Sequence, residues 1–121
     1  MMPAPIAVVE DHEGLRRALV RLLQASGHEV RSYASAEELL ASEKSERASC
    51  LILDVRLPGL SGFELHQRLV DQGSKVPVIY VTAHDDPAVR ERAVLEGAAF
   101  FLKPVEREPL LAAVARALGR A

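Results

Sequence analysis

Apolar runs that alternate with helical patterns predict an α/β fold for this 121-residue chain. Short β-branched or aromatic runs are typical of buried parallel strands, and a segment with apolar residues at helical spacing follows each of them. Such units favour a doubly wound, flavodoxin-like sheet of five parallel strands in the order 2-1-3-4-5, with helices on both faces. The strands are expected at 6–9, 29–32, 50–53, 78–81 and 100–102.

The first half of the chain contains two of these strand–helix units. After strand 6–9, apolar residues recur at helical spacing from Leu15 to Leu23, and Gly27 ends the helix. Strand 29–32 is less apolar than the others, so we expect it at an edge of the sheet. Ser35 and Glu38 have the spacing of a capping box, which predicts a short helix over 39–40. The polar segment 42–49 is expected to be a mobile surface loop.

The second half contains three more units. The third strand ends at Asp54 and leads through a turn-rich loop, 55–62, into a helix that contains Leu65 and Leu69. The fourth strand ends at Thr82, after which Asp85-Asp86-Pro87 predicts a cap and a first-turn proline for a helix that ends at Gly97. The fifth strand ends at Lys103-Pro104, and the last helix covers 110–118.

Composition sets the broad class of protein. The chain is expected to be one domain, 1–121, either free-standing or part of a longer protein. A net charge of −2 with scattered arginines gives no case for nucleic-acid binding. The single cysteine, Cys50, opens an apolar run and is expected in the core. No targeting or membrane-spanning segment is visible, so we expect a cytoplasmic protein without membrane contact. The charged residues of 90–96 are expected to form a solvated helix face.

Polar side chains stand where four of the apolar runs end. They are Glu10 and Asp11, Asp54, Thr82 and Lys103. Each has an ordinary explanation by itself: the acidic pair could cap a helix, the threonine could belong to the strand, and the lysine could be solvated. Parallel strands, however, bring their carboxyl ends to one edge of the sheet, where ligands bind in open α/β folds. Four such ends together favour a functional site.

The chemistry of that site follows from its charges. Three neighbouring carboxylates repel one another unless a cation is shared between them. An all-oxygen site suits Mg²⁺, or Mn²⁺ as an alternative, better than zinc. Lys103 is suited to balance the charge of an arriving phosphoryl group, a carboxylate can accept that group, and Thr82 could donate a hydrogen bond to it.

In nearly its whole length the sequence resembles the receiver domain of two-component response regulators. The resemblance rests on motifs in a fixed order, which are Val8-Val9-Glu10-Asp11, Leu53-Asp54-Val55-Arg56-Leu57-Pro58 with Ser61-Gly62, Val81-Thr82-Ala83, and Leu102-Lys103-Pro104. Arg56 and His84 resemble the FixJ-type subfamily. Each motif alone is weak evidence, but all of them in this order and at these spacings are specific for the receiver family.

The resemblance implies a role for each site residue. Asp54 resembles the phosphoacceptor, Asp11 a direct Mg²⁺ ligand, and Glu10 a residue that helps to bind the metal through water. The backbone carbonyl of Arg56 resembles the third protein ligand. Thr82 resembles the switch hydroxyl and Lys103 the phosphate counter-ion, with a cis bond to Pro104.

The switch aromatic is the point where this sequence departs from the family. Phe100, three residues before Lys103, is at the usual position, but the segment from Gly97 to Lys103 is one residue shorter than in most members. Phe101 is therefore an alternative, and both could be simple core residues.

The resemblance implies a signalling switch and not a turnover enzyme. A histidine kinase or a phosphotransfer protein would donate the phosphoryl group, and slow hydrolysis would remove it. Output would pass through the face formed by the fourth helix, the fifth strand and the last helix, to a fused output domain, DNA-binding in some relatives, or to a second copy in a phosphorylation-dependent homodimer. Two alternatives remain: a degenerate receiver that only binds partners, and an aspartate-nucleophile phosphohydrolase. The hydrolase is disfavoured because Arg56 stands where such enzymes have a second aspartate.

Overall fold

The computed structural model describes residues 4–42 and 48–119, and most of the expected surface loop, 43–47, lies outside them. Five strands alternate with five helices along the described chain. Their bounds are β1 Ile6–Val9, α1 Glu13–Ala25, β2 Val30–Tyr33, α2 Ala36–Ala41, β3 Cys50–Asp54, α3 Gly62–Asp71, β4 Val78–Thr82, α4 Pro87–Leu95, β5 Ala99–Leu102 and α5 Arg107–Ala117. The alternation confirms the predicted α/β class.

The strands form one parallel sheet in the order β2-β1-β3-β4-β5, as predicted. The less apolar strand β2 lies at an edge and is only half-buried, whereas β1, β3 and β4 are buried along their whole length. Since β1 and β3 are neighbours although α1, β2 and α2 separate them in the chain, the sheet has the expected switch point between them.

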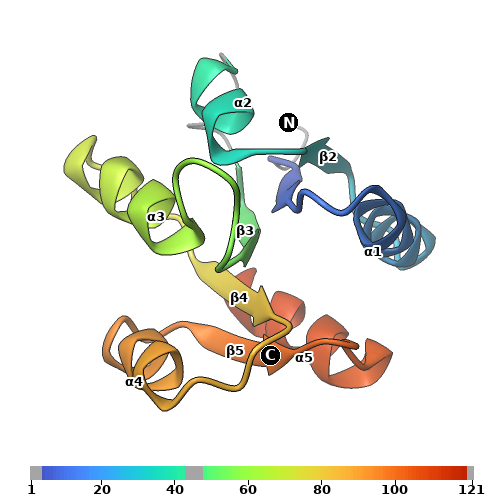
Figure 1. Cartoon of the computed structure of the whole chain (residues 1–121). Helices are drawn as coiled ribbons and strands as arrows, with labels where there is room; N and C mark the ends of the chain where they lie inside the picture. Colours follow the sequence, from blue (N-terminus) through green and yellow to red (C-terminus); the bar gives the residue numbers. More distant parts are fainter. Residues whose placement is uncertain (1–3, 43–47, 120–121) are drawn as a thin grey trace.

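Each face of the sheet has its own core. Figure 1 shows α2, α3 and α4 on one face and α1 and α5 on the other. Alternate residues of the strands supply the two cores, so Leu53 and Tyr80 pack towards α3 while Ile52 and Val81 pack towards α1 and α5. Cys50 is fully buried in the second core, as expected, and burial raises the pKa of its thiol to about 12.

Helix starts differ in part from the predictions. Ser35 caps α2 by accepting from the Glu38 backbone N–H, but the Glu38 carboxylate accepts from the Ala34 backbone N–H, so only half of the expected capping box forms. A complete capping box occurs instead at Ser61 and Glu64, at the start of α3.

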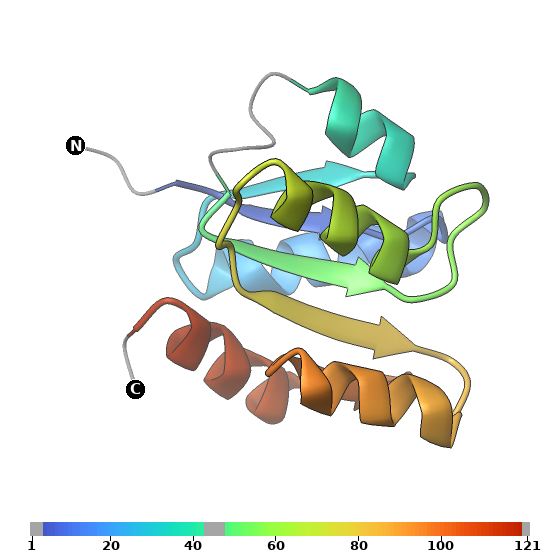
Figure 2. The ribbon, with the colours of Figure 1, turned by 90° about the vertical axis from the view of Figure 1, so that its left-hand side faces the viewer.

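The carboxyl ends of the strands and the loops that follow β3 and β4 lie together at one end of the molecule, at the right of Figure 2. The acidic pair at the end of β1 does not cap α1, because the His12 side chain accepts from the Leu15 backbone N–H at that helix start. Glu10 and Asp11 therefore remain available for another purpose. Among the described residues, no helix is both long and apolar enough to cross a membrane.

Candidate functional site

The structure brings the polar strand-end residues together at the carboxyl edge of the sheet. Glu10, Asp54 and Thr82 are the buried polar or charged side chains of residues 4–42 and 48–119. Asp11 is exposed beside them, and Lys103 is half-buried. Burying carboxylates is unfavourable unless they are paired or bind a cation, so this cluster indicates a functional site.

Lys103 extends from the end of β5 across β4 to the two buried carboxylates. Its Nζ lies 2.8 Å from Asp54 Oδ2 and 2.7 Å from Glu10 Oε1. Burial lowers the pKa of Lys103, but the hydrogen bonds and charges of Asp54 and Glu10 outweigh burial and raise it above its ordinary value. The lysine is therefore cationic at neutral pH and faces the carboxylate that the sequence indicates as the phosphoryl acceptor. The Lys103–Pro104 peptide bond is cis, as expected.

Asp54 is held by the loop that follows it. Its Oδ1 accepts from the Arg56 backbone N–H at 3.0 Å, and the Gly62 backbone N–H donates to the Val55 carbonyl at 3.0 Å. A Cβ on Gly62 would lie 2.4 Å from the Asp54 backbone oxygen, so only a glycine lets α3 begin this close to β3. Gly62 thus fixes the loop around Asp54, a role that the Ser61-Gly62 pattern alone does not reveal.

Three carboxylates could share a cation at this edge. Glu10, Asp11 and Asp54 each offer an oxygen, and these atoms all lie within 4.8 Å of one another. Burial raises the pKa of Glu10, although Lys103 and the His12 backbone N–H oppose the shift. A divalent cation would favour the charged form of such a carboxylate. The donor set consists of hard oxygens and is open to solvent through Asp11, which fits Mg²⁺. The Arg56 side chain is exposed, and metal binding by its carbonyl stays a prediction.

Thr82 lies on β4, next to the strand of Asp54, and Phe100 lies on the edge strand β5. Thr82 Oγ1 accepts from the His84 backbone N–H at 3.2 Å, and the Thr82 carbonyl accepts from the Lys103 backbone N–H at 2.8 Å. In the sheet Phe100 pairs with Tyr80, and Phe101 pairs with Val81. Because side chains alternate along a strand, Phe100 shares the α4 face with Tyr80 and Thr82, while Phe101 packs towards α5.

One sequence-based expectation about α4 is wrong. Glu96 does not belong to a solvated face, because its Oε1 accepts from the hydroxyl of buried Tyr80 and lies 2.8 Å from His66 Nδ1. Its Oε2 accepts from Arg92 at 3.2 Å. The alternating charges of 90–96 gave no sequence signal that the Glu96 side chain points towards the core. Buried Tyr80, which needs a hydroxyl partner, was the available signal.

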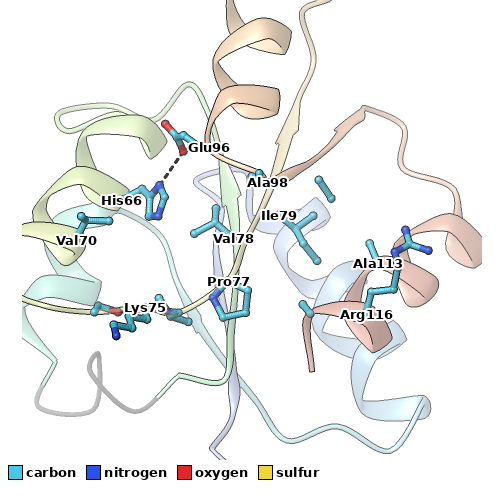
Figure 3. A pocket seen from close by; sticks show the side chains of 15 residues that line it. His66, Val70, Lys75, Pro77, Val78, Ile79, Glu96, Ala98, Ala113 and Arg116 are labelled. Carbon is cyan, nitrogen blue, oxygen red and sulfur yellow. Dashed lines mark hydrogen bonds and ion pairs between the residues drawn. The ribbon is translucent and has the colours of Figure 1, made fainter. Parts of the chain in front are cut away.

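A groove of about 720 Å³ lies elsewhere, at the amino ends of β4 and β5, between the last turns of α3 and α5. Figure 3 shows Lys75 and Arg116 at the groove, with the His66–Glu96 contact on the α3 side. Asp54 and its neighbours are at the opposite end of the strands, so the groove is separate from the acidic site.

Comparison with known proteins places this geometry in a family. The model of the response regulator receiver domain matches residues 6–115. Nodulation protein W of Bradyrhizobium diazoefficiens is 42% identical over 97% of this chain and 52% of its own length. The transcriptional regulatory protein FixJ of Azorhizobium caulinodans is 38% identical over 96% of this chain and 56% of its own length. The chain therefore spans about half the length of these curated relatives.

Solved structures agree with the sequence comparison. The FixJ-N crystal structure has a TM-score of 0.85 at 31% identity and covers 100% of this chain and 98% of its own. The chemotaxis protein CheY4 of Vibrio cholerae has a TM-score of 0.84 at 28% identity, covering 97% of this chain and 100% of its own. Family model, sequence relatives and fold all agree, and the chain belongs to the response regulator receiver domain family.

Proposed function

We propose that the domain is a phosphorelay switch that accepts a phosphoryl group on Asp54. The observation that carries the proposal is the position of the Asp54 carboxylate, with Oδ2 2.8 Å from Lys103 Nζ and Oδ1 3.0 Å from the Arg56 backbone N–H. Two donors orient the carboxylate, and the lysine is placed to neutralise charge on the incoming group. The buried carboxylates also supply the oxygens that a catalytic Mg²⁺ needs.

In the proposed transfer, an Asp54 carboxylate oxygen attacks the phosphorus of a phosphohistidine on a histidine kinase or phosphotransfer protein. The phosphorus–nitrogen bond breaks, the histidine keeps the bonding electrons and takes up a proton, and an aspartyl phosphate forms. Later attack by water releases inorganic phosphate and restores the carboxylate. Glu10, Asp11, Asp54 and the Arg56 carbonyl would hold Mg²⁺, or Mn²⁺ in its place, and the ion would neutralise charge on the phosphoryl oxygens.

Thr82 and Phe100 would report the modification to the surface. Thr82 lies at the end of β4, next to Asp54 in the sheet order, and its hydroxyl could turn towards a phosphoryl oxygen. Phe100 is supported as the aromatic partner because it shares the Thr82 face and packs beneath Arg90 of α4, whose guanidinium carbon lies 5.2 Å from the ring centroid. The outward face of α4, β5 and α5 would then contact an output domain or a second copy.

The proposal is tested by intact mass after incubation with acetyl phosphate, in which acetate is the leaving group. Wild type and Asp54→Asn are compared, each with Mg²⁺ and with a chelator. We expect one phosphoryl group on wild type with Mg²⁺ only, and none on the variant. Addition to both proteins would move the acceptor to another residue. Unmodified wild type, together with no Mg²⁺ binding by calorimetry and no phosphate release, would instead support a degenerate receiver that only binds partners.

A further inference from the structure

A compact polar cluster joins three elements behind the switch strand. The Tyr80 ring is fully buried on β4, and its hydroxyl reaches Glu96 at the end of α4 and His66 Nδ1 of α3, the latter at 3.0 Å. His66 Nδ1 also lies 2.8 Å from Glu96 Oε1, the contact drawn in Figure 3. We name Tyr80, His66 and Glu96 the α4 anchor. Tyr80 is the sheet partner of Leu53, the residue that precedes Asp54, and its side chain lies on the face covered by α3 and α4.

The protonation of the anchor follows from its geometry. Burial first, and then the contact with Glu96, raises the pKa of Tyr80 well above its ordinary value, so the hydroxyl stays a donor. Burial raises the pKa of Glu96, but hydrogen bonds from Tyr80, His66 and Arg92 outweigh burial and lower it. Because Tyr80 gives its only hydrogen to Oε1, His66 Nδ1 must carry a hydrogen as well to lie favourably beside that oxygen. The contacts of Tyr80 and His66 with Glu96 are then both hydrogen bonds to a carboxylate, the stronger kind.

Helix α4 has few other attachments. Ala93 is its one buried residue among those described, while Val94 and Leu95 are 70% and 80% exposed. Val89 is half-buried against the same core, and two arginines lie over aromatic rings, with Arg92 4.4 Å from the Phe63 ring centroid and Arg90 above Phe100. Apolar packing therefore holds α4 weakly, and the anchor is the strongest contact of its last turn.

The anchor also lies next to the proposed switch. Tyr80 precedes Thr82 by two residues on β4, so both side chains point to the α4 face, and Tyr80 is the sheet partner of Phe100. A movement of α4 relative to β4 would change the space around Phe100 and the loop that begins at Thr82. The place where α4 is held should therefore influence both residues.

We infer that Tyr80, His66 and Glu96 fix the C-terminal end of α4 to β4 and α3, and act as positioning residues that hold the switch in its unphosphorylated arrangement. The second half of this inference rests on the proposed function. Loss of the anchor frees the last turn of α4 and shifts the population towards arrangements in which α4 has moved. A phosphodonor that selects such arrangements then reacts faster.

Tyr80→Phe tests the inference, because it removes one hydroxyl and keeps the ring that packs 4.6 Å from Phe63 between centroids. Tyr33→Phe is the matched control, since Tyr33 also loses a hydroxyl that bonds to a side chain, that of Ser42 near the opposite edge of the sheet. The first readout is amide hydrogen exchange at Glu96, Gly97 and Ala98, whose N–H groups donate to the carbonyls of α4. We expect exchange there to be about twofold to tenfold faster in Tyr80→Phe, as for the loss of one hydrogen bond, and unchanged in Tyr33→Phe.

The second readout is the initial rate of phosphorylation by acetyl phosphate with Mg²⁺. We expect a rise of about twofold to tenfold in Tyr80→Phe and in Glu96→Ala, and none in Tyr33→Phe. Glu96→Gln keeps an oxygen that accepts from Tyr80 and His66, so it should restore most of the wild-type rate, which a general loss of stability would not do.

The outcomes separate the two proposals. Unchanged exchange at 96–98 in both Tyr80→Phe and Glu96→Ala would overturn the anchor. Faster exchange with an unchanged phosphorylation rate would overturn its role in positioning the switch. If wild type accepts no phosphoryl group at all, the proposed function fails, and with it the role in the switch, while the exchange result still decides whether the anchor holds α4.

Discussion

Helices α3 and α4 cover the same face of the sheet, yet they are held in different ways. Four residues of α3 are buried, a capping box fixes its start, and Gly62 lies against the backbone of the proposed acceptor. In α4 one residue is buried and Val89 is half-buried, and the helix is otherwise attached through Tyr80, His66 and the two arginines. Apolar packing is cooperative and hard to rearrange, whereas a few polar contacts can be exchanged at low cost.

The difference matches what the proposed switch requires of each helix. The loop before α3 must keep Asp54 in a fixed orientation for phosphoryl transfer, and several hydrogen bonds and close contacts hold that loop in place. The helix after Thr82 must be able to move when the acceptor is modified, so it is attached by contacts that can break. In the proposed switch, the tightly packed half would carry out the chemistry and the more loosely held half would transmit the result.

The largest predicted contrast between the helices is in stability. Leu69 of α3 is 1% exposed and Leu95 of α4 is 80% exposed. Leu69→Ala should lower the free energy of unfolding by about 2–5 kcal/mol, because it removes packed methyl groups and leaves a cavity. Leu95→Ala should change it by no more than about 0.5 kcal/mol. Urea unfolding of the two variants measures both values, and similar losses in the two helices would contradict the contrast.

A smaller effect is expected at the start of α3. Gly62→Ala would place a Cβ 2.4 Å from the Asp54 backbone oxygen, so the loop must shift, at a cost of about 1–3 kcal/mol. Because that loop orients Asp54, acetyl phosphate should also modify the variant more slowly than wild type, as intact mass would show.

Gly14→Ala is the control for this substitution. A Cβ at Gly14 would lie 3.2 Å from the exposed His12 ring, which caps α1, so the ring must give by a few tenths of an ångström but no backbone has to move. The higher helix-forming preference of alanine and the crowded cap act in opposite directions, so the stability should change by less than about 1 kcal/mol, and the phosphorylation rate should stay unchanged. Equal slowing in both variants would mean that any glycine-to-alanine change perturbs the site.

The smallest predicted effect concerns pH and α4. The pKa of Glu96 is lowered in the folded protein from an unfolded value of 4.5, so the unfolded chain binds a proton first. Its contribution to stability is therefore present above pH 4.5 and is lost as the pH falls through the lower folded value. Urea unfolding between pH 3 and 6 should show a shallower loss for Glu96→Gln than for wild type. Parallel curves would show that the Glu96 carboxylate does not stabilise α4.

The sequence predicts the fold in detail because the signals are local and repeated. Unbroken apolar runs mark the buried strands, and the weaker run at β2 correctly indicates an edge. Strands β3 and β4 end at Asp54 and Thr82, as expected, whereas β2 lies one residue later than expected and β5 begins one residue earlier, at Ala99. The grouping of Glu10, Asp54, Thr82 and Lys103 follows from topology, since parallel strands bring their ends together.

Contacts that depend on the third dimension could not be predicted in the same way. The complete capping box at Ser61 lies within a turn-rich loop, where the sequence pattern did not single it out. Glu38 accepts from the Ala34 backbone N–H, and not from the Ser35 N–H that its spacing suggests. Glu96 looks like a solvated charge until the position of Tyr80 is known. Long-range polar pairs leave no periodic trace in a sequence, so they appear only when the helices are placed.

Amide hydrogen exchange, compared before and after phosphorylation of Asp54 by acetyl phosphate and Mg²⁺, tests most directly whether the domain has a rigid half and a movable half. The prediction is that protection changes between Thr82 and Ala98 and in β5, while that of α3, 62–71, stays the same. A change centred on α3, with α4 and its anchor unaffected, would contradict the account.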